Sequence, residues 1–191
     1  QASGGVVPGW PQVNGLVKAL VSDGAGGWFV GGSFTRVGGL PRNNLAHIRS
    51  DHSVDSWSPN ANGTVYALAL GGTAVYAGGE FTIIGGQNRN RLAALNATTG
   101  LATSWNPNPN GYVHTIVVDG TTVYAGGGFW LIGGQTRQFI AALDAATGAA
   151  GAWNPNADNE VHTLALNGTT VYAGGLFRDI GGQPRLKIAA L

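Results

Sequence analysis

The 191-residue sequence contains no cysteine and no methionine. Without cysteine, neither a disulfide framework nor a cysteine nucleophile is available. Charged residues make up only 10% of the chain and the formal net charge is +1, which gives no electrostatic basis for binding nucleic acid or an anionic membrane. No apolar run approaches the roughly 20 residues of a membrane-spanning helix. No stretch keeps a helical hydrophobic period over about 11 residues. These absences favour an all-β protein that does not insert into membranes.

Signatures of catalysis are also missing. The sequence has no G-x-S-x-G nucleophile elbow, no H-E-x-x-H zinc motif, no Walker-type phosphate loop and no Asp-rich calcium loop. Only nine acidic residues are present, and Glu80 and Glu160 fall at different positions of the repeat described below, so they form no obvious acid–base pair. We therefore expect no enzymatic activity, no cofactor and no catalytic residue.

Glycine and apolar residues are abundant, with 33 glycines and 43% hydrophobic residues. This hydrophobic content, without a long block of charge, is typical of a folded chain rather than a disordered one. The sequence has little Lys and Glu and much Gly, Asn, Thr and Trp, which resembles the composition of secreted bacterial β proteins. Its first residue is not Met, which indicates a processed chain or an excised segment. We expect an extracellular or cell-surface protein.

Copies of one unit occupy almost the whole chain. The segment VYAGGGFWLIGGQTRQFIAALDAATGAAGAWNPN begins at Val123, close copies begin at Val75 and Val171, and a looser copy begins at Phe29. Three sets of anchor residues recur every 47 or 48 residues: Trp10, Trp57, Trp105 and Trp153; Phe34, Phe81, Phe129 and Phe177; Arg42, Arg89, Arg137 and Arg185. A period of about 40–50 residues is typical of propellers and solenoid arrays.

Each unit reads as four short strands. An apolar first strand such as YVHTIVV is followed by a turn, a second strand TVYAGG, a Gly-rich hairpin IGGQxR, a third strand IAAL, the turn DAATG and a short fourth strand that ends at Trp. Several first strands are apolar on consecutive residues, which indicates burial of both faces between packed sheets. Four-stranded antiparallel sheets repeated around an axis make a β-propeller. We predict an all-β propeller of four blades, with repeats at approximately residues 15–62, 63–110, 111–158 and 159–191; a β-solenoid is the alternative.

The strand missing from the last repeat is present at the other end of the chain. KIAAL ends a third strand at the C-terminus, and ASGGVVPGWPQVN near the N-terminus aligns with ATGAAGAWNPNAD. We predict that residues 1–14 supply the strand that completes the last blade, which removes an exposed sheet edge. One chain could close on itself as a four-bladed ring, or two chains could exchange this strand and form an eight-bladed ring. A fragment of a longer array is a third alternative.

The segment IAALDAATGAAGAWNPN resembles the repeats of quinoprotein-type propellers, whose signature is A-x-D-x-x-T-G followed by Trp. The wider unit resembles propeller-like repeats of large secreted or surface-anchored bacterial proteins. The resemblance implies that the repeated tryptophans lock neighbouring blades together, and we assign a structural role to the repeated phenylalanines as well. The first repeat departs most from the pattern, because AHIRSDHSVDSW lacks the Asp-x-x-Thr-Gly turn.

Candidate ligand contacts lie on one predicted face of the propeller. Strand alternation places the WNPN connectors and the IGGQxR hairpins on the same face, which is the usual ligand face of propellers. The hairpins repeat a Gln-x-Arg pair at Gln87/Arg89, Gln135/Arg137 and Gln183/Arg185, with Leu40/Arg42 as a partial copy. Arg offers a fork of donors for a sugar hydroxyl or a carboxylate. An element repeated in every blade also suits a shared structural role, in which each Arg binds loop carbonyls.

Differences between the repeats single out individual contact residues. After the repeated Phe, the first two repeats have Thr35-Arg36 and Thr82-Ile83, whereas the last two have Trp130-Leu131 and Arg178-Asp179. Exposed Trp and Arg dominate recognition hot spots. We predict Trp130 as the main contact residue, with Arg178, Arg137 and Gln135 near it.

Two further sets of residues are given structural interpretations. Equivalent positions of the innermost strand hold Lys18, Tyr66, His114 and His162. Two histidines could bind a metal, but Lys and Tyr do not complete a usual ligand set, so we expect no metal. The glycosylation sequons at Asn62, Asn96 and Asn167 each lie at an expected turn, and we favour the turn interpretation.

These observations favour a non-enzymatic secreted propeller that acts as a binding or scaffold module for a glycan or a surface protein. The alternative is a purely structural subunit of an extracellular assembly, such as a surface layer, a fibre or a larger ring, that self-associates through its terminal strand. The remnant of a quinoprotein-like enzyme is a third alternative, but it would need a larger ring and a polar, metal-bearing centre.

Overall fold

The computed structural model describes residue 5 and residues 7–191, and this part of the chain consists of strands and turns. It contains no helix that could span a membrane bilayer. The strands form four similar units, here called blades. Each blade has an antiparallel sheet of three strands, and a hairpin of two short strands, here called the outer hairpin, lies between its second and third strands. The predicted all-β class and repeated antiparallel sheets are confirmed.

The blades follow one another along the chain. The first blade contains β1 (Leu16–Ser22), β2 (Trp28–Ser33), β3 (Arg36–Val37), β4 (Leu40–Pro41) and β5 (Leu45–Ile48). The second contains β6 (Val65–Gly71), β7 (Ala74–Gly79), β8 (Ile83–Ile84), β9 (Gln87–Asn88) and β10 (Leu92–Asn96). The third contains β11 (Val113–Asp119), β12 (Thr122–Gly127), β13 (Leu131–Ile132), β14 (Gln135–Thr136) and β15 (Ile140–Asp144). The fourth contains β16 (Val161–Asn167), β17 (Thr170–Gly175), β18 (Asp179–Ile180), β19 (Gln183–Pro184) and β20 (Ile188–Ala190).

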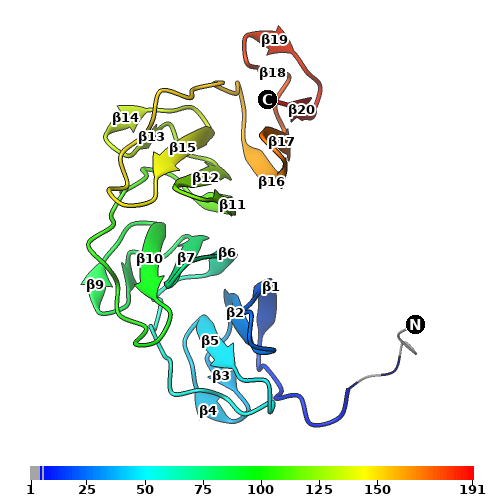
Figure 1. Cartoon of the computed structure of the whole chain (residues 1–191), viewed down its shortest axis with the longest axis vertical. Coiled ribbons are helices and arrows are strands. Elements are labelled where there is room, and N and C mark those ends of the chain that lie inside the picture. Colours follow the sequence, from blue (N-terminus) through cyan, green and yellow to red (C-terminus); the bar gives the residue numbers. More distant parts are fainter. Residues whose placement is uncertain (1–4, 6) are drawn as a thin grey trace.

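The four blades stand side by side along an open arc (Figure 1). The first strands β1, β6, β11 and β16 line its inner side, each packed against the first strand of the next blade, and the outer hairpins lie on its outer side. The first and fourth blades occupy opposite ends of the arc. The arrangement around an axis is that of a propeller, and the single chain has the half-ring shape of the eight-bladed alternative rather than a closed circle.

In the first three blades the fourth strand is reduced to a single bridge with the third strand, at Ile48–Val54, Leu95–Ala102 and Leu143–Ala150. In the last blade, Leu191 is the residue equivalent to Ile48, Leu95 and Leu143. The closing strand predicted for residues 1–14 lies partly outside the described residues, which omit residues 1–4 and 6. In the described part, Trp10 stacks on His52 with ring centroids 5.2 Å apart, and Val13 bridges Val37, so this segment lies against the first blade.

Most of the hydrophobic core lies between the blades, and a smaller cluster that includes Val30 and Phe34 lies inside the first blade. One cluster joins the first and second blades through Phe29, Leu45, Val65 and Leu68. Equivalent clusters join the second blade to the third and the third to the fourth. Sheets that pack face to face bury both of their faces, which explains why the first strands are apolar on consecutive residues.

The repeated Ala-Gly-Gly at the end of the second strand has a steric cause, shown by Gly78 and Gly79. A Cβ on Gly78 would lie 2.7 Å from Val113 of the next blade. A Cβ on Gly79 would lie 2.1 Å from the Thr64 carbonyl oxygen, next to the irregularity in the β6–β7 register between Val65 and Ala67. The first glycine therefore admits the neighbouring blade, and the second allows close approach of the opposite strand at a β-bulge.

The third-to-fourth strand turn differs in the first blade, as its sequence indicates. In the third blade the Asp144 carboxylate accepts hydrogen bonds from the N–H groups of Ala146 and Thr147 and from the Thr147 hydroxyl. The first blade uses Asp51 instead, which accepts from the Ser53 N–H at 2.9 Å and from the Ser53 hydroxyl at 2.6 Å.

After the fourth-strand bridge, Asp55 accepts from the Trp57 N–H at 2.8 Å and from Arg49 Nε at 2.6 Å. Burial favours the protonated form of Asp55, but these hydrogen bonds outweigh it, and the pKa of Asp55 lies below its ordinary value of 3.8.

We expect Asp55→Asn to lower the free energy of unfolding by about 1–2 kcal/mol at neutral pH, because hydrogen bonds to a charged group are lost. A carboxyl whose pKa is depressed in the folded state stabilises the fold above its unfolded pKa and loses this contribution as the pH falls through the folded pKa. The difference from the parent protein should therefore shrink below pH 3.8. Urea unfolding across this range tests the prediction, with the exposed Asp119→Asn as control; a difference that does not depend on pH would contradict it.

Candidate functional site

The connectors between blades and the outer hairpins form one continuous surface, here called the connector face. Each connector accepts a hydrogen bond from a glycine N–H of the hairpin behind it, as from Gly85 to the Pro59 carbonyl and from Gly133 to the Pro107 carbonyl, both at 2.7 Å. Gly181 donates to the Pro155 carbonyl in the same way at 2.6 Å. These backbone contacts bring together the WNPN and IGGQxR segments from distant parts of each repeat.

One side chain in each connector fixes the start of the outer hairpin. The Asn110 Oδ1 atom accepts hydrogen bonds from the N–H groups of Trp130 and Leu131, both at 3.0 Å. The same paired contact is made at the equivalent positions Asn14, Asn62 and Asp158. The Asn62 amide also donates to the Thr82 hydroxyl, so the first of the three sequons has its side chain engaged in this contact. Sequence reasoning treated Asn62 only as a turn former and did not consider the other three, although their constant spacing of 48 is visible in the sequence.

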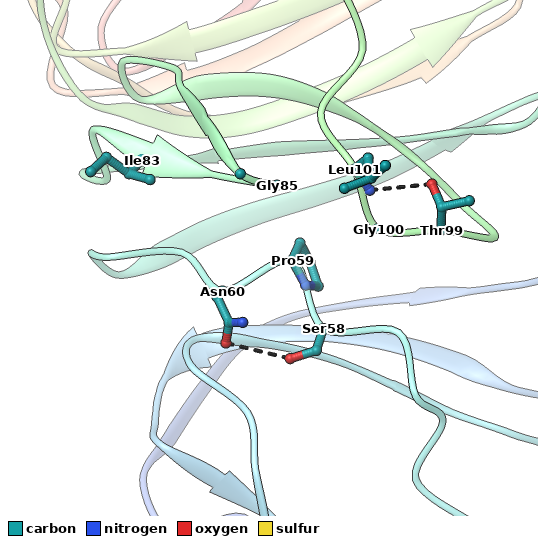
Figure 2. A pocket seen from close by; sticks show the side chains of 9 residues that line it. Ser58, Pro59, Asn60, Ile83, Gly85, Thr99, Gly100 and Leu101 are labelled. Carbon is teal, nitrogen blue, oxygen red and sulfur yellow. Dashed lines mark hydrogen bonds between the residues drawn. The ribbon is translucent and has the colours of Figure 1, made fainter.

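A shallow pocket of about 350 Å³ opens between a connector and the hairpin behind it (Figure 2). Ser58, Pro59 and Asn60 line one side, and Ile83, Gly85 and the segment 99–101 line the other. A similar pocket of about 390 Å³ lies between the segments 154–158 and 179–182 of the last two blades. Pro59, Ile83 and Leu101 make the lining of the first pocket more apolar than polar.

The repeated arginines are bound to backbone carbonyls of their own blade. Arg89 donates through Nη1 to the Asn88 carbonyl at 2.8 Å and through Nη2 to the Thr103 carbonyl at 2.6 Å. Arg42 and Arg137 make the equivalent pair of contacts, and the exposed Arg185 donates to the Pro184 carbonyl. A guanidinium held in this way positions the hairpin with two of its five N–H donors. The Nε atoms of Arg42, Arg89 and Arg137 are buried without a hydrogen-bond partner.

The other predicted contact residues are exposed. Gln87, Gln135 and Gln183 lie at the starts of β9, β14 and β19. Arg178 is exposed just before β18. Trp130 is the most exposed tryptophan among the described residues, with 64% of its surface accessible, and the exposed Leu131 follows it.

The repeated tryptophans connect neighbouring blades. Trp105 is buried, donates from Nε1 to the Asp144 carbonyl at 2.9 Å, and meets the Tyr76 ring edge-on with centroids 5.1 Å apart. Trp57 makes the same contacts with the Asn96 carbonyl and Phe29. Trp153 packs against Tyr124. The repeated phenylalanines are buried as well, at Phe34, Phe81, Phe129 and Phe177.

A row of polar rings lines the inner side of the arc, here called the hub row. The Tyr66 and His114 ring centroids are 5.5 Å apart, and those of His114 and His162 are 5.1 Å apart. Glu160 joins this row: its Oε2 atom lies 3.4 Å from His114 Nε2 and 3.0 Å from His162 Nε2. Sequence reasoning missed the role of Glu160, because it compared the two glutamates by repeat position and did not consider that this one lies two residues before His162, just ahead of β16.

Burial and charge set the ionisation of the hub row. Desolvation raises the pKa of Tyr66 to about 12, with help from its hydrogen bond to Glu80. Desolvation lowers the pKa of His114, and this outweighs the opposite effect of the Glu160 carboxylate. His114 is therefore neutral near pH 7 and has a lone pair available on its imidazole.

Comparisons with known proteins agree with the arrangement of the blades around an axis. A family model described as a domain of unknown function (DUF5122) beta-propeller matches residues 26–56, in the first blade. The crystal structure of the computationally designed Ika4 protein matches with a TM-score of 0.58 and 13% identity over 94% of this chain and 94% of that chain. The structure of the RRP9 WD40 repeats matches with a TM-score of 0.59 and 11% identity.

The chain has a β-propeller fold. WD40 repeats form propellers, and the match covers 88% of this chain but 48% of the RRP9 chain, so this propeller chain spans about half the length of that one. No curated protein matches the sequence. Both structural matches have low sequence identity, so they establish the fold of this propeller and not its ligand.

Proposed function

We propose that this propeller is a non-enzymatic, extracellular binding or scaffold module that holds a glycan or a surface protein on its connector face. The observation that supports the proposal best is Trp130, whose indole is largely exposed while its backbone N–H is fixed by Asn110. A large apolar ring on a backbone position that is already fixed loses little conformational entropy when it binds a partner.

The surroundings of Trp130 suit a ligand that is partly apolar and partly polar. The exposed Leu131 extends the apolar surface, and the Gln135 side chain on the same hairpin offers an amide donor and acceptor. Indole faces stack on the apolar faces of sugar rings and also fill pockets of partner proteins. Because Arg137 is engaged with the Thr136 and Gly151 carbonyls, it supports the hairpin rather than the ligand.

A second candidate function is that of a structural subunit of a larger extracellular ring. The observation that favours it is the open arc, whose two ends expose apolar blade faces. A scaffold subunit would use these ends to assemble, and its connector face would remain free for a ligand.

We expect Trp130→Thr to weaken binding to glycan-array hits by about 30-fold, the effect of losing a hot-spot side chain worth about 2 kcal/mol. Threonine occupies the equivalent positions 35 and 82, so the hairpin should keep its fold. Oligosaccharide titration followed by tryptophan fluorescence measures the change, and Thr82→Ala on the neighbouring blade is the matched control. Unchanged affinity in Trp130→Thr would remove Trp130 from the site. If the parent protein binds no glycan on the array, the glycan class is wrong and a surface protein remains as the proposed ligand.

A further inference from the structure

The end of the arc formed by the first blade exposes side chains that are buried in every other blade. Val17 pairs with Gly32 as Val65 pairs with Gly79, so these two valines are equivalent. Val17 is 42% exposed and the nearby Leu20 is 57% exposed. The residues equivalent to these two are at most 9% exposed in the other blades: Val65, Val113 and Val161; Leu68, Ile116 and Leu164. With Trp10, which lines an apolar hollow beside Leu20, Val17 and Leu20 form what is here called the leading face.

The other end of the arc exposes the matching surface. Ile188 of β20 is 69% exposed, whereas the equivalent Leu45, Leu92 and Ile140 are completely buried. Tyr172 of β17 is 41% exposed, whereas the equivalent Phe29 and Tyr76 are buried and Tyr124 is partly buried. These two residues, together with Gly174 between them in the sheet, form what is here called the trailing face.

The leading and trailing faces are the two halves of one type of joint. Inside the chain, Ile140 lies in the same core cluster as Val161 and Leu164 of the following blade. A Cβ on Gly126 would lie 2.7 Å from Val161, whereas a Cβ on Gly174 would meet only Thr163 and Lys187 of its own blade. Tyr76 and Tyr124 each pack on the tryptophan that precedes the following blade, Trp105 and Trp153. Tyr172 is the equivalent ring of the last blade, and the equivalent tryptophan is Trp10.

We propose that a second copy of this chain covers both ends, so that the leading face of each copy packs on the trailing face of the other and closes an eight-bladed ring. The half-ring shape of the arc lets two copies complete a circle about a common two-fold axis (Figure 1). Each joint repeats the contacts that already hold the blades together three times within the chain. The proposal goes beyond the connector-face function, which concerns a different surface.

The N-terminal segment of the second copy completes the last blade. Val7, three residues before Trp10, corresponds to Val54, Ala102 and Ala150, which bridge the third strand of each earlier blade, and Leu191 corresponds to their bridge partners. Ala102 and Ala150 each donate to a hairpin glycine carbonyl at 3.0 Å, so the Val7 N–H would donate to Gly181. Pro8 has no N–H, so this strand makes one ladder hydrogen bond fewer than the others, which an edge strand tolerates.

The test is the mass of the full chain in solution, measured by light scattering. The proposal predicts about 39 kDa, twice the 19.5 kDa of one chain. A leading-face variant, Leu20→Arg, and a trailing-face variant, Ile188→Arg, should each lose the closed ring, because the guanidinium would be buried without a partner. Leu101→Arg, at an exposed leucine away from both ends, is the matched control and should keep the mass of the parent.

Mixing the two variants shows whether the leading face packs on the trailing face or on another leading face. Each variant has one intact face, so Leu20→Arg and Ile188→Arg together can form one good joint between them and recover a two-chain species that neither forms alone. A joint between like faces would instead leave one of the single variants fully dimeric. A 19.5 kDa parent protein, an open-ended polymer, or folded variants that keep 39 kDa would each overturn the proposal.

A different observation, the cluster of His114, Glu160 and His162 in the hub row, carries a second inference. The three ligand atoms lie within 4.8 Å of one another, with histidine-to-carboxylate distances of 3.4 and 3.0 Å. Zinc bonds of about 2.1 Å in tetrahedral geometry place ligand atoms about 3.4 Å apart. The Glu160 carboxylate packs against Gly128, where a side chain would crowd it: a Cβ on Gly128 would lie 3.0 Å from Glu160 Oε1.

We propose that these three side chains bind a zinc-class divalent cation, with a fourth position open to solvent on the inner side of the arc. Two imidazoles and one carboxylate are a common ligand set for zinc. All three residues come from the third and fourth blades of one chain, so this site does not require the two-chain ring.

The test is calorimetric titration of the full chain with Zn²⁺, with the thermal midpoint as a second readout. One ion should bind per chain and raise the midpoint. Glu160→Thr and His162→Tyr install the residues of the second blade, Thr64 and Tyr66, and each should weaken Zn²⁺ binding by more than the roughly 10-fold effect of an outer-shell change. The control His52→Asn should not change the affinity. Absence of saturable binding, or equal affinity in all variants, would overturn the site.

Discussion

Trp105→Ala is expected to lower the free energy of unfolding by about 3–5 kcal/mol, the usual cost of removing a buried tryptophan. The indole of Trp105 is buried between the second and third blades, where it touches Tyr76 and donates to the Asp144 carbonyl. The substitution leaves a cavity at the joint and also leaves a carbonyl without its donor. The midpoint of urea-induced unfolding measures the effect.

Trp130→Ala is the control for this prediction, because the same residue type is removed from an exposed position. Its effect should remain within about 0.5 kcal/mol, as for most surface substitutions. A loss below 1 kcal/mol in Trp105→Ala would show that the joints between blades are not held by their tryptophans.

Gly79→Ala is expected to have a comparable effect, about 3 kcal/mol or more, at the upper end of what overpacking costs. The added methyl group would lie 2.1 Å from the Thr64 carbonyl oxygen and 3.1 Å from the Val65 Cα atom, both in the backbone of the neighbouring strand. Backbone atoms cannot move aside as a side chain would, so the bulge between β6 and β7 must open.

The matched control is Gly151→Ala, where the new methyl group would be 3.7 Å from its nearest neighbour, an ordinary contact. Its unfolding midpoint should stay close to that of the parent. Equal effects of the two substitutions would indicate that the repeated second glycine of Ala-Gly-Gly serves backbone flexibility rather than close approach of the strands.

The fold could be predicted from the sequence because its contacts are local and repeated. The constant spacing of Trp57, Trp105 and Trp153 indicated one supersecondary unit per 48 residues, and consecutive apolar residues in the first strands indicated sheets stacked face to face. The structure shows that most of the core lies in these joints.

The shape of the whole chain could not be predicted in the same way. Whether four blades close a circle depends on the angle between neighbouring sheets, which is set by the side chains that fill each joint, such as Leu92 against Val113 and Ile116. That angle has no signature in the repeat spacing. The place of Glu160 in the hub row was missed for a related reason: His114 and Glu160 are 46 residues apart and meet only because adjacent blades place their first strands side by side.

The arrangement of the candidate contact residues was only partly accessible. The exposure of Trp130 follows from its departure from the pattern of the other blades, which the sequence shows directly. The contacts of Arg89 with two carbonyls depend on the path of the fourth strand, and residue types alone do not distinguish them from contacts with a ligand.

The most direct measurement of how the ring closes is disulfide trapping with Val7→Cys and Leu191→Cys in a chain that otherwise has no cysteine. The equivalent pair Leu95–Ala102 bridges two antiparallel strands, and directly opposed residues that exchange no hydrogen bonds lie about 4.5 Å apart, within the range of a disulfide. Our account predicts a covalent species of two chains on a non-reducing gel, at twice 19.5 kDa. A disulfide formed within a single chain, or no disulfide under oxidising conditions, would contradict it.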